Sequence, residues 1–121
     1  MDKLEYIPGD LVTYNGNIVI IENSDGYYAT YYDADEFLQE INVNEIKGIP
    51  LTPEILEKNG WKKPDGFDSY WLNKIGLLQE GNTWHSALGS TKIAITLGNI
   101  QYVHQLQHFL FGLGINHEME V

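Results

Sequence analysis

The dipeptide Asn15-Gly16 is the feature of the sequence that most constrains its fold. It lies between LVTY and NIVII, two runs rich in β-branched and aromatic residues that are typical of strands. Asn-Gly is the pair favoured in the two-residue turns that connect antiparallel strands. The sequence therefore predicts a β-hairpin from Leu11 to Glu22.

More short strands are expected in the rest of the N-terminal half. A turn at SDG, residues 24–26, leads into YYATYY, in which alternate side chains face opposite sides of a strand. After the acidic loop DADE, the stretch that contains Ile41, Val43 and residues 46–49 has an extended pattern more than a helical one. Several short strands joined by tight turns predict a small SH3-like β-barrel or meander over residues 1–50.

The pattern changes at LTPEILEKNG, which carries the signals of a short helix. Thr52 can cap this helix and Pro53 suits its first position, while Asn59-Gly60 suits its exit. Three strands of a small antiparallel sheet are expected in the segments that follow it, KKPDGFDSYWLNK, IGLLQEGNTWHS and STKIAITLG. The turns that separate them are expected at Asp65-Gly66, Gly81-Asn82 and Gly89-Ser90.

A C-terminal helix is predicted from Ile100 to Leu113, with Gly114 as its stop. At about 100° per residue, one side of this helix is apolar and is expected to cover the preceding sheet. That side consists of Tyr102, Val103, Leu106, Phe109, Leu110 and Leu113. No repeat or Pro/Ser-rich linker separates the halves, so residues 1–121 are expected to form a single α+β domain in which residues 51–121 contribute helix, sheet and helix.

Composition excludes several classes of protein. The 121 residues include no cysteine, which removes disulfides, thiolate zinc sites and thiol nucleophiles. No apolar run approaches the ~20 residues of a membrane helix, and the first ten residues contain no apolar signal region. No nucleophile elbow or phosphate-binding loop is present, so the sequence assigns no catalytic residue and no cofactor. A soluble cytoplasmic protein without a membrane partner is expected.

The charge distribution narrows the range of partners. The formal net charge is −10, and residues 1–50 carry ten acidic residues and two lysines. All seven basic residues are lysine, so the forked guanidinium that binds phosphate or guanine is absent. Direct binding of duplex nucleic acid is therefore not expected. An acidic surface instead fits a basic protein partner, or it serves only to keep the chain soluble.

Two histidines in the predicted helix are the first candidate site. His104 and His108 lie four residues apart, opposite the apolar side and next to Phe111. Such a pair can share a zinc ion, but the metalloprotease pattern needs a glutamate where this chain has Gln105. An exposed phenylalanine beside the pair indicates an interface instead. Ordinary surface histidines are the first interpretation of the pair; if it is functional, we expect a partner or homo-oligomer contact and assign no metal.

Trp84, His85 and Lys92 form the second candidate site. Aromatic rings can stack on a planar ligand such as a nucleobase, although tryptophan also often belongs to the core. A pocket lined by these three residues would favour capture of a small nucleotide-like ligand. A continuous acidic ridge would favour mimicry of nucleic acid.

Two segments carry a resemblance to a known group of proteins. IKGIPLTPEILEKNGW and LGNIQYVHQLQHFLFGLG resemble segments of small uncharacterised proteins of Bacteroidetes phages and mobile elements, which pair IPLT-x-E-IL-x-K-x-G with a later YVHQLQ helix. The resemblance implies a phage or mobile-element origin and action in the cytoplasm of a bacterial host cell. By association, it implies a non-enzymatic counter-defence binder that sequesters a small nucleotide-like ligand. The alternative is an acidic module that blocks a host nucleic-acid-binding or defence protein.

Overall fold

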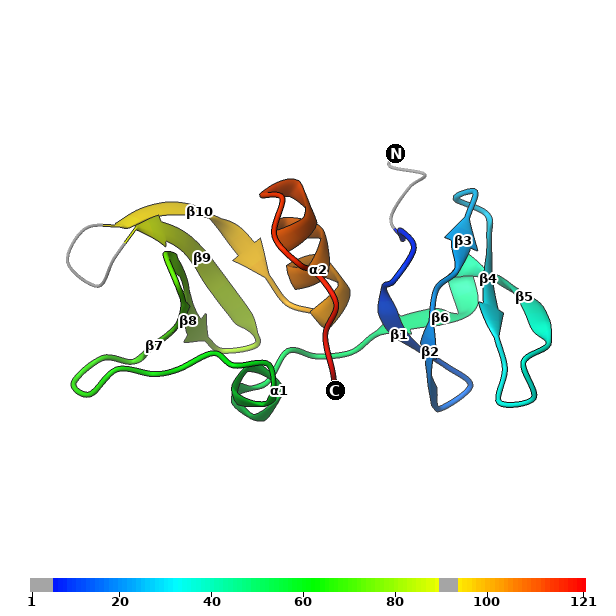
Figure 1. Cartoon of the computed structure of the whole chain (residues 1–121), viewed down its shortest axis with the longest axis horizontal. Coiled ribbons are helices and arrows are strands. Elements are labelled where there is room, and N and C mark those ends of the chain that lie inside the picture. Colours follow the sequence, from blue (N-terminus) through cyan, green and yellow to red (C-terminus); the bar gives the residue numbers. More distant parts are fainter. Residues whose placement is uncertain (1–5, 90–93) are drawn as a thin grey trace. The chain divides into compact units, whose positions relative to one another are not determined.

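The computed structural model describes residues 6–89 and 94–121, and the side chains of all of these except residues 94–97 (Figure 1). The chain divides into two compact units. The first unit combines Met1–Ile49 with Tyr102–Met119, and the second combines Pro50–Gln101 with Glu120–Val121. The boundary after Ile49 lies one residue from the predicted division, and the single domain expected for residues 1–121 stays a prediction.

The strands of the first unit form two small antiparallel sheets. One has the order β2-β1-β6, and the other has the order β3-β4-β5. A 3-10 helix, η1, connects β5 to β6. The bounds are β1 Leu11–Tyr14, β2 Asn17–Ile20, β3 Asn23–Ser24, β4 Tyr28–Tyr32, β5 Leu38–Asn42, η1 Val43–Glu45 and β6 Ile46–Gly48.

The predicted hairpin is confirmed at its turn. Tyr14 pairs with Asn17 across the loop, and the register continues to the pair of Leu11 and Ile20. Asn15 and Gly16 both have a positive φ, 54° and 80°, which the tight turn requires and which these residue types tolerate best. The local sequence therefore determines the register of β1 and β2.

One apolar cluster lies between the two sheets of the first unit. Val12 and Val19 form a cross-strand pair in one sheet, and Ala29 and Ile41 form one in the other. All four side chains are buried in the same cluster, together with Tyr6, Ile21 and Ile46. Each sheet thus turns one face toward a shared core and leaves its other face available for contacts.

The predicted fold class is confirmed at the level of α+β with small antiparallel sheets and a C-terminal helix. The predicted SH3-like barrel is not confirmed, because the two sheets of the first unit, within its described residues, stay open and do not close. The segment after β2 links the two sheets: it leaves the first sheet beyond Ile20, and the Glu22 N–H donates to the Thr30 carbonyl of the second sheet at 2.7 Å.

The second unit contains a short helix and a four-stranded antiparallel meander of order β10-β9-β8-β7. Thr52 caps the helix as predicted, since its Oγ1 accepts the Ile55 N–H at 3.2 Å. The bounds are α1 Pro53–Lys58, β7 Ser69–Leu72, β8 Ile75–Glu80, β9 Thr83–Gly89 and β10 Ala94–Ile100. Residues 90–93, which the third expected strand includes, lie outside the described residues.

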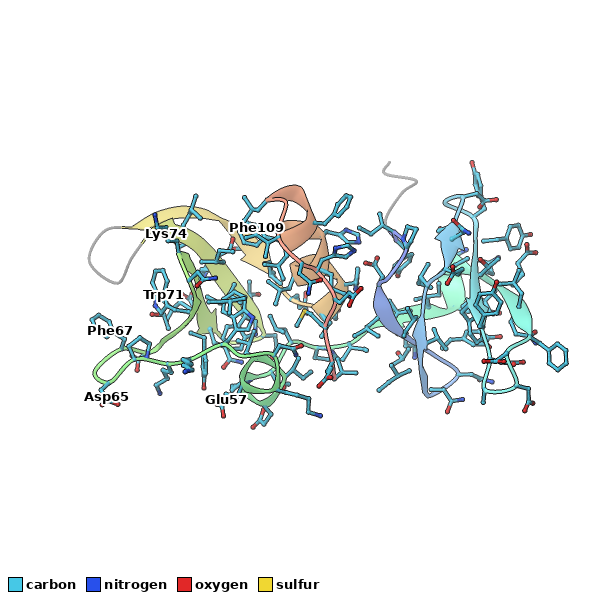
Figure 2. All side chains as sticks on the ribbon, viewed as in Figure 1. Glu57, Asp65, Phe67, Trp71, Lys74 and Phe109 are labelled. Atoms are coloured by element: carbon cyan, nitrogen blue, oxygen red, sulfur yellow. The ribbon has the colours of Figure 1, made fainter. Side chains whose placement is uncertain are left out.

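The sheet of the second unit has four strands where the sequence predicted three. The missed turn lies at Asn73-Lys74, where Asn73 has a φ of 54° and Leu72 pairs with Ile75. Trp71, labelled in Figure 2, fixes the resulting β7–β8 hairpin from one face. A Cβ on Gly76 would come within 2.7 Å of the Trp71 ring, so glycine is required for this close packing.

The C-terminal helix α2, Val103–Gly112, confirms the predicted helix with a later start. The Val103 N–H donates to the Ile49 carbonyl at 2.8 Å, and the Leu11 N–H donates to Gln107 Oε1 at 2.9 Å. These bonds join α2 to the first unit, whereas the sequence predicted that it would cover the sheet of the second half. Within the described residues, no helix combines the length and the apolar character needed to cross a membrane.

The buried side of α2 supplies the first testable prediction. Leu106 is fully buried, so replacing it with alanine should lower the free energy of unfolding by about 2–5 kcal/mol, as cavity-forming substitutions do. Leu113→Ala is the matched control, because Leu113 is exposed at the end of the same helix. Urea denaturation measures both variants. A loss below about 0.5 kcal/mol for Leu106→Ala would show that the core side of α2 is assigned wrongly.

Candidate functional site

Trp84 belongs to the core of the second unit. Its side chain is fully buried, and its Nε1–H donates to the Leu51 carbonyl at 3.0 Å. Its ring meets Tyr70 edge-on, with centroids 6.0 Å apart. A ring enclosed in this way has no open face for stacking on a ligand, so the core role that the sequence left open accounts for Trp84.

His85 and Lys92 do not complete a pocket with Trp84 in the described part of the chain. His85 follows Trp84 on β9 and therefore faces the other side of the sheet. Its Nδ1 lies 2.7 Å from Asn99 Oδ1, and its Nε2 lies 3.3 Å from Glu80 Oε2. Lys92 lies outside the described residues. The proposed binding roles of His85 and Lys92 stay predictions.

His104 is part of the core of the first unit, and the expectation that both helix histidines lie on its surface is wrong for this residue. Its side chain is about 3% exposed. The ring stacks on Tyr102 with centroids 5.8 Å apart and an interplanar angle of 10°, and its centroid lies 5.2 Å from that of Tyr6. Burial lowers the pKa of His104 from 6.5 to about 4, against the opposing effect of Asp10. The ring is therefore neutral at neutral pH.

His108 is half-buried and paired with a carboxylate that the sequence did not single out. Its Nε2 lies 2.6 Å from Oδ2 of Asp10, a fully buried side chain. The same Asp10 oxygen accepts the Ile7 N–H at 2.9 Å. With Asp10 as the carboxylate, His108 Nε2–H is the donor, and the pair holds the segment before β1 against α2. We therefore interpret His108 as a structural residue.

Gln107 completes this connection. Its buried amide accepts the Leu11 N–H through Oε1 and donates through Nε2 to the carbonyls of Gly9 and His117, at 2.9 to 3.0 Å. We call Asp10, Gln107 and His108 the polar clasp. Within residues 6–89 and 94–121, no group of three or more His, Asp or Glu side chains is arranged to hold a metal ion.

Phe111 lies on the open side of α2, as the sequence predicted. It is 59% exposed, and its ring meets His117 edge-on with centroids 5.0 Å apart. A large exposed aromatic side chain next to a histidine is consistent with a contact surface, and its role in one stays a prediction.

The structure also contains a groove that the sequence analysis did not assign. It has a volume of about 740 Å³, lies wholly within the first unit and runs along β2 and the end of β4. We call it the β2 groove. Its lining consists of Tyr14, Asn15, Asn17, Ile18, Val19, Ile20, Glu22, Tyr31, Tyr32, Asp33 and Ala34. Three tyrosines and two exposed isoleucines give it an aromatic and apolar wall.

The charged groups of the β2 groove are both acidic. Glu22 lies at one end of β2, Asp33 follows β4, and no lysine belongs to the lining. Asp33 accepts the backbone N–H of Phe37 at 3.0 Å and of Asp35 at 2.9 Å, and Gln39 Nε2–H at 2.9 Å. These bonds, that of Phe37 foremost, lower the pKa of Asp33 below its usual value. The groove is therefore negatively charged at neutral pH.

The signal for this groove was present in the sequence but was not used. In NIVII, Val19 and Ile21 are buried, while Ile18 and Ile20 lie on the other side of the same strand and are 56% and 58% exposed. A strand that is apolar on both faces differs from the usual alternation of apolar and polar residues in a half-exposed sheet. That departure indicates a second contact surface.

Comparison with known proteins assigns no function to these residues. No family model matches the chain, and neither a curated protein nor a solved structure shows significant similarity to it.

The buried His104 supplies a prediction about pH. Between about pH 6.5 and pH 4, the unfolded chain takes up a proton at His104 and the folded chain does not, so acidification through this window favours unfolding. The effect reaches about 3 kcal/mol at most. His104→Leu should therefore flatten the pH dependence of the free energy of unfolding, measured by urea denaturation at several pH values.

Asp10 and His108, whose charges act on His104, are present in both proteins, so the difference between the two slopes reports on His104. Phe67→Leu, at an exposed position without a titratable group, serves as the control and should keep the slope of the original protein. If the free energy of unfolding of His104→Leu depended on pH as steeply as that of the original protein, the assignment of His104 as a buried neutral imidazole would be contradicted.

Proposed function

We propose that this protein is a non-enzymatic, acidic protein-binding module of a phage or mobile element, which takes up a basic segment of a host protein in the β2 groove. The observation that carries the proposal is the lining of the groove, in which Glu22 and Asp33 accompany tyrosine and isoleucine side chains without any lysine. The phage or mobile-element origin rests on the resemblance of the IPLT and YVHQLQ segments.

The charge around the groove supports a cationic partner. Residues 6–49 carry eight acidic side chains and one lysine, Lys47, so the field over this part of the chain is negative. Lys47 lies beside Thr13 and Glu45 and does not belong to the lining of the groove. A concentration of one sign of charge accelerates the encounter with a partner of the opposite sign.

The groove also suits the chemistry of basic side chains. Lysine and arginine carry apolar stems that pack on apolar walls, and their charged groups are attracted to the faces of tyrosine rings. Tyr14 and Tyr31 lie with ring centroids 6.1 Å apart, and Tyr32 is exposed beside them. A host nucleic-acid-binding or defence protein offers the basic surface that such a site would block.

A small nucleotide-like ligand is the second candidate occupant. The three tyrosines favour it, because any nucleobase can stack on an aromatic ring. The phosphates of such a ligand would face Glu22 and Asp33, with no lysine in the lining to neutralise them. We therefore rank this candidate below the basic protein segment.

We further infer that the protein acts in the cytoplasm of a bacterial host cell. We also infer an SH3-like arrangement for the first unit. The order of the elements supports the fold: β2 continues through Glu22 into β3, so that consecutive strands contribute to both sheets, and η1 separates β5 from β6. Domains of that type bind extended segments in aromatic-lined grooves, which agrees with the proposed occupant.

The charge of the groove supplies the test of the proposed function. The probe is a lysine-flanked extended peptide, KVTVTVK, whose affinity is measured by isothermal titration calorimetry at low ionic strength. The double change Glu22→Gln and Asp33→Asn removes both charges, and asparagine keeps an acceptor for the Phe37 N–H. We expect the double variant to bind the peptide at least about tenfold more weakly.

The control for this test changes the net charge equally at residues that do not line the groove. Glu54→Gln and Asp65→Asn lie in the second unit, where Asp65 is labelled in Figure 2, and should leave the affinity nearly unchanged. Equal weakening in both double variants would show only a response to net charge. Absence of binding to the original protein would contradict the proposed function.

The exposed Phe111 supplies a separate prediction about assembly. We propose that it serves a homo-oligomer contact, so Phe111→Asp should reduce the molecular mass in solution, because a buried carboxylate without a partner is costly. Phe67→Asp is the control, since Phe67 is an exposed phenylalanine of the second unit (Figure 2). Analytical ultracentrifugation that gives the same mass for the original protein and Phe111→Asp would contradict the oligomer contact.

A further inference from the structure

β2 has a free edge. Its residues pair with β1, from Tyr14 opposite Asn17 to Leu11 opposite Ile20, and no other strand among the described residues pairs with it. An edge strand presents a row of backbone N–H and carbonyl groups that can accept a further strand. The β2 groove lies along this strand, because all four residues of β2 belong to its lining.

Two residues direct their backbone groups away from β1. Ile21 exchanges hydrogen bonds with the segment before β1, through its N–H to the Asp10 carbonyl and its carbonyl to the Gly9 N–H. In an antiparallel ladder such residues alternate, so Asn17 and Val19 also face β1. The backbone groups of Ile18 and Ile20 therefore face the other way.

Glu22 confirms this direction. Its N–H has the same orientation in the alternation as that of Ile20, and it donates to the Thr30 carbonyl of β4 at 2.7 Å. The chain thus reaches the second sheet at Glu22, while the outward groups of Ile18 and Ile20 border the groove. The Glu22 bond shows that the outward-facing backbone groups next to β2 can form hydrogen bonds with a neighbouring strand.

β2 also lacks the features that protect an edge strand. Its sequence, NIVI, contains no proline and no charged residue, and Ile18 and Ile20 are both more than half exposed. Natural edge strands are usually blocked by lysine, proline or a bulge, which prevent pairing with another chain. An apolar and unblocked edge is therefore a template for strand pairing.

On the basis of the proposed function, we propose that the basic partner segment binds as an added β-strand along the free edge of β2. Backbone hydrogen bonds to Ile18 and Ile20 hold the segment, side chains on one face pack against the tyrosines of the groove, and cationic residues lie next to Glu22 and Asp33. This mode of recognition takes affinity from the backbone and specificity from alternate side chains.

The charges distinguish this occupant from a second copy of the chain. A second copy would bring its own acidic first half, with eight acids and one lysine in residues 6–49, against Glu22 and Asp33. Its own β2 offers no cation to either carboxylate. Like charges brought together oppose association, so the edge of β2 selects a basic segment over self-pairing.

Amide hydrogen exchange measured by NMR tests the added strand. The probe is the KVTVTVK peptide with the full-length protein. In the complex, the amide protons of Ile18 and Ile20 should exchange at least about tenfold more slowly, because they gain partners. The amide proton of Val19, which already bonds to β1, is the internal control and should change by less than about twofold.

A peptide pair supplies the second arm. N-methylation at alternate residues removes either the N–H groups that would face β2 or those that would face away from it. The peptide methylated on the side that faces β2 should lose at least about tenfold in affinity, and its counterpart should keep its affinity. Tight binding without protection of Ile18 and Ile20, or with equal affinity of both methylated peptides, would overturn the added strand and leave the proposed function intact. No binding of the unmethylated peptide would overturn both.

Discussion

The side chain of Gln107 makes the hydrogen bonds on which the arrangement of the first unit depends. Its amide joins the backbone of Gly9, Leu11 and His117, and the bond to Gly9 spans 98 residues of sequence. The amide is fully buried, so each bond that it loses would leave a polar group without a partner at a cost of about 1–3 kcal/mol. Asp10 and His108 strengthen the same connection with a charge-assisted bond. The polar clasp therefore explains why a C-terminal helix belongs to the same compact unit as the N-terminal hairpin.

The clasp also positions the central strand of the first sheet. β1 lies in the middle of its sheet, with β6 on one side and β2 on the other, and the clasp fixes the backbone immediately before it. β2 is tied to β1 by the two-residue turn at Asn15-Gly16 and has no strand on its far side among the described residues. Its free edge, the tyrosines of β1 and β4 and two carboxylates then form one groove. The proposed binding function depends on this combination of an unpaired backbone, apolar side chains and negative charge.

The parts of the fold that local signals specify could be predicted from the sequence. The Asn15-Gly16 turn, the Thr52 cap of α1 and the helical period of α2 each depend on residues a few positions apart. The burial of His104 and Gln107 could not be predicted in this way, because their partners Tyr6, Gly9 and Leu11 lie almost a hundred residues earlier. The helical period placed His104 opposite the apolar side and therefore on the surface, whereas its contacts make it part of the core. The sequence NIVII indicates the apolar outer face of β2 but not its position beside a groove, since the free edge of a strand is a property of the sheet and not of its sequence.

The central claim is that the basic partner binds beside β2 and at neither of the sites that the sequence singled out. Mapping of backbone amide chemical shifts during titration with the lysine-flanked peptide tests this claim most directly. We expect the largest changes in residues 17–22 and 31–37, which border or adjoin the groove, while α2 and the second unit change little. Largest changes around Phe111 in α2, or around Trp84 and His85 in β9, would contradict it.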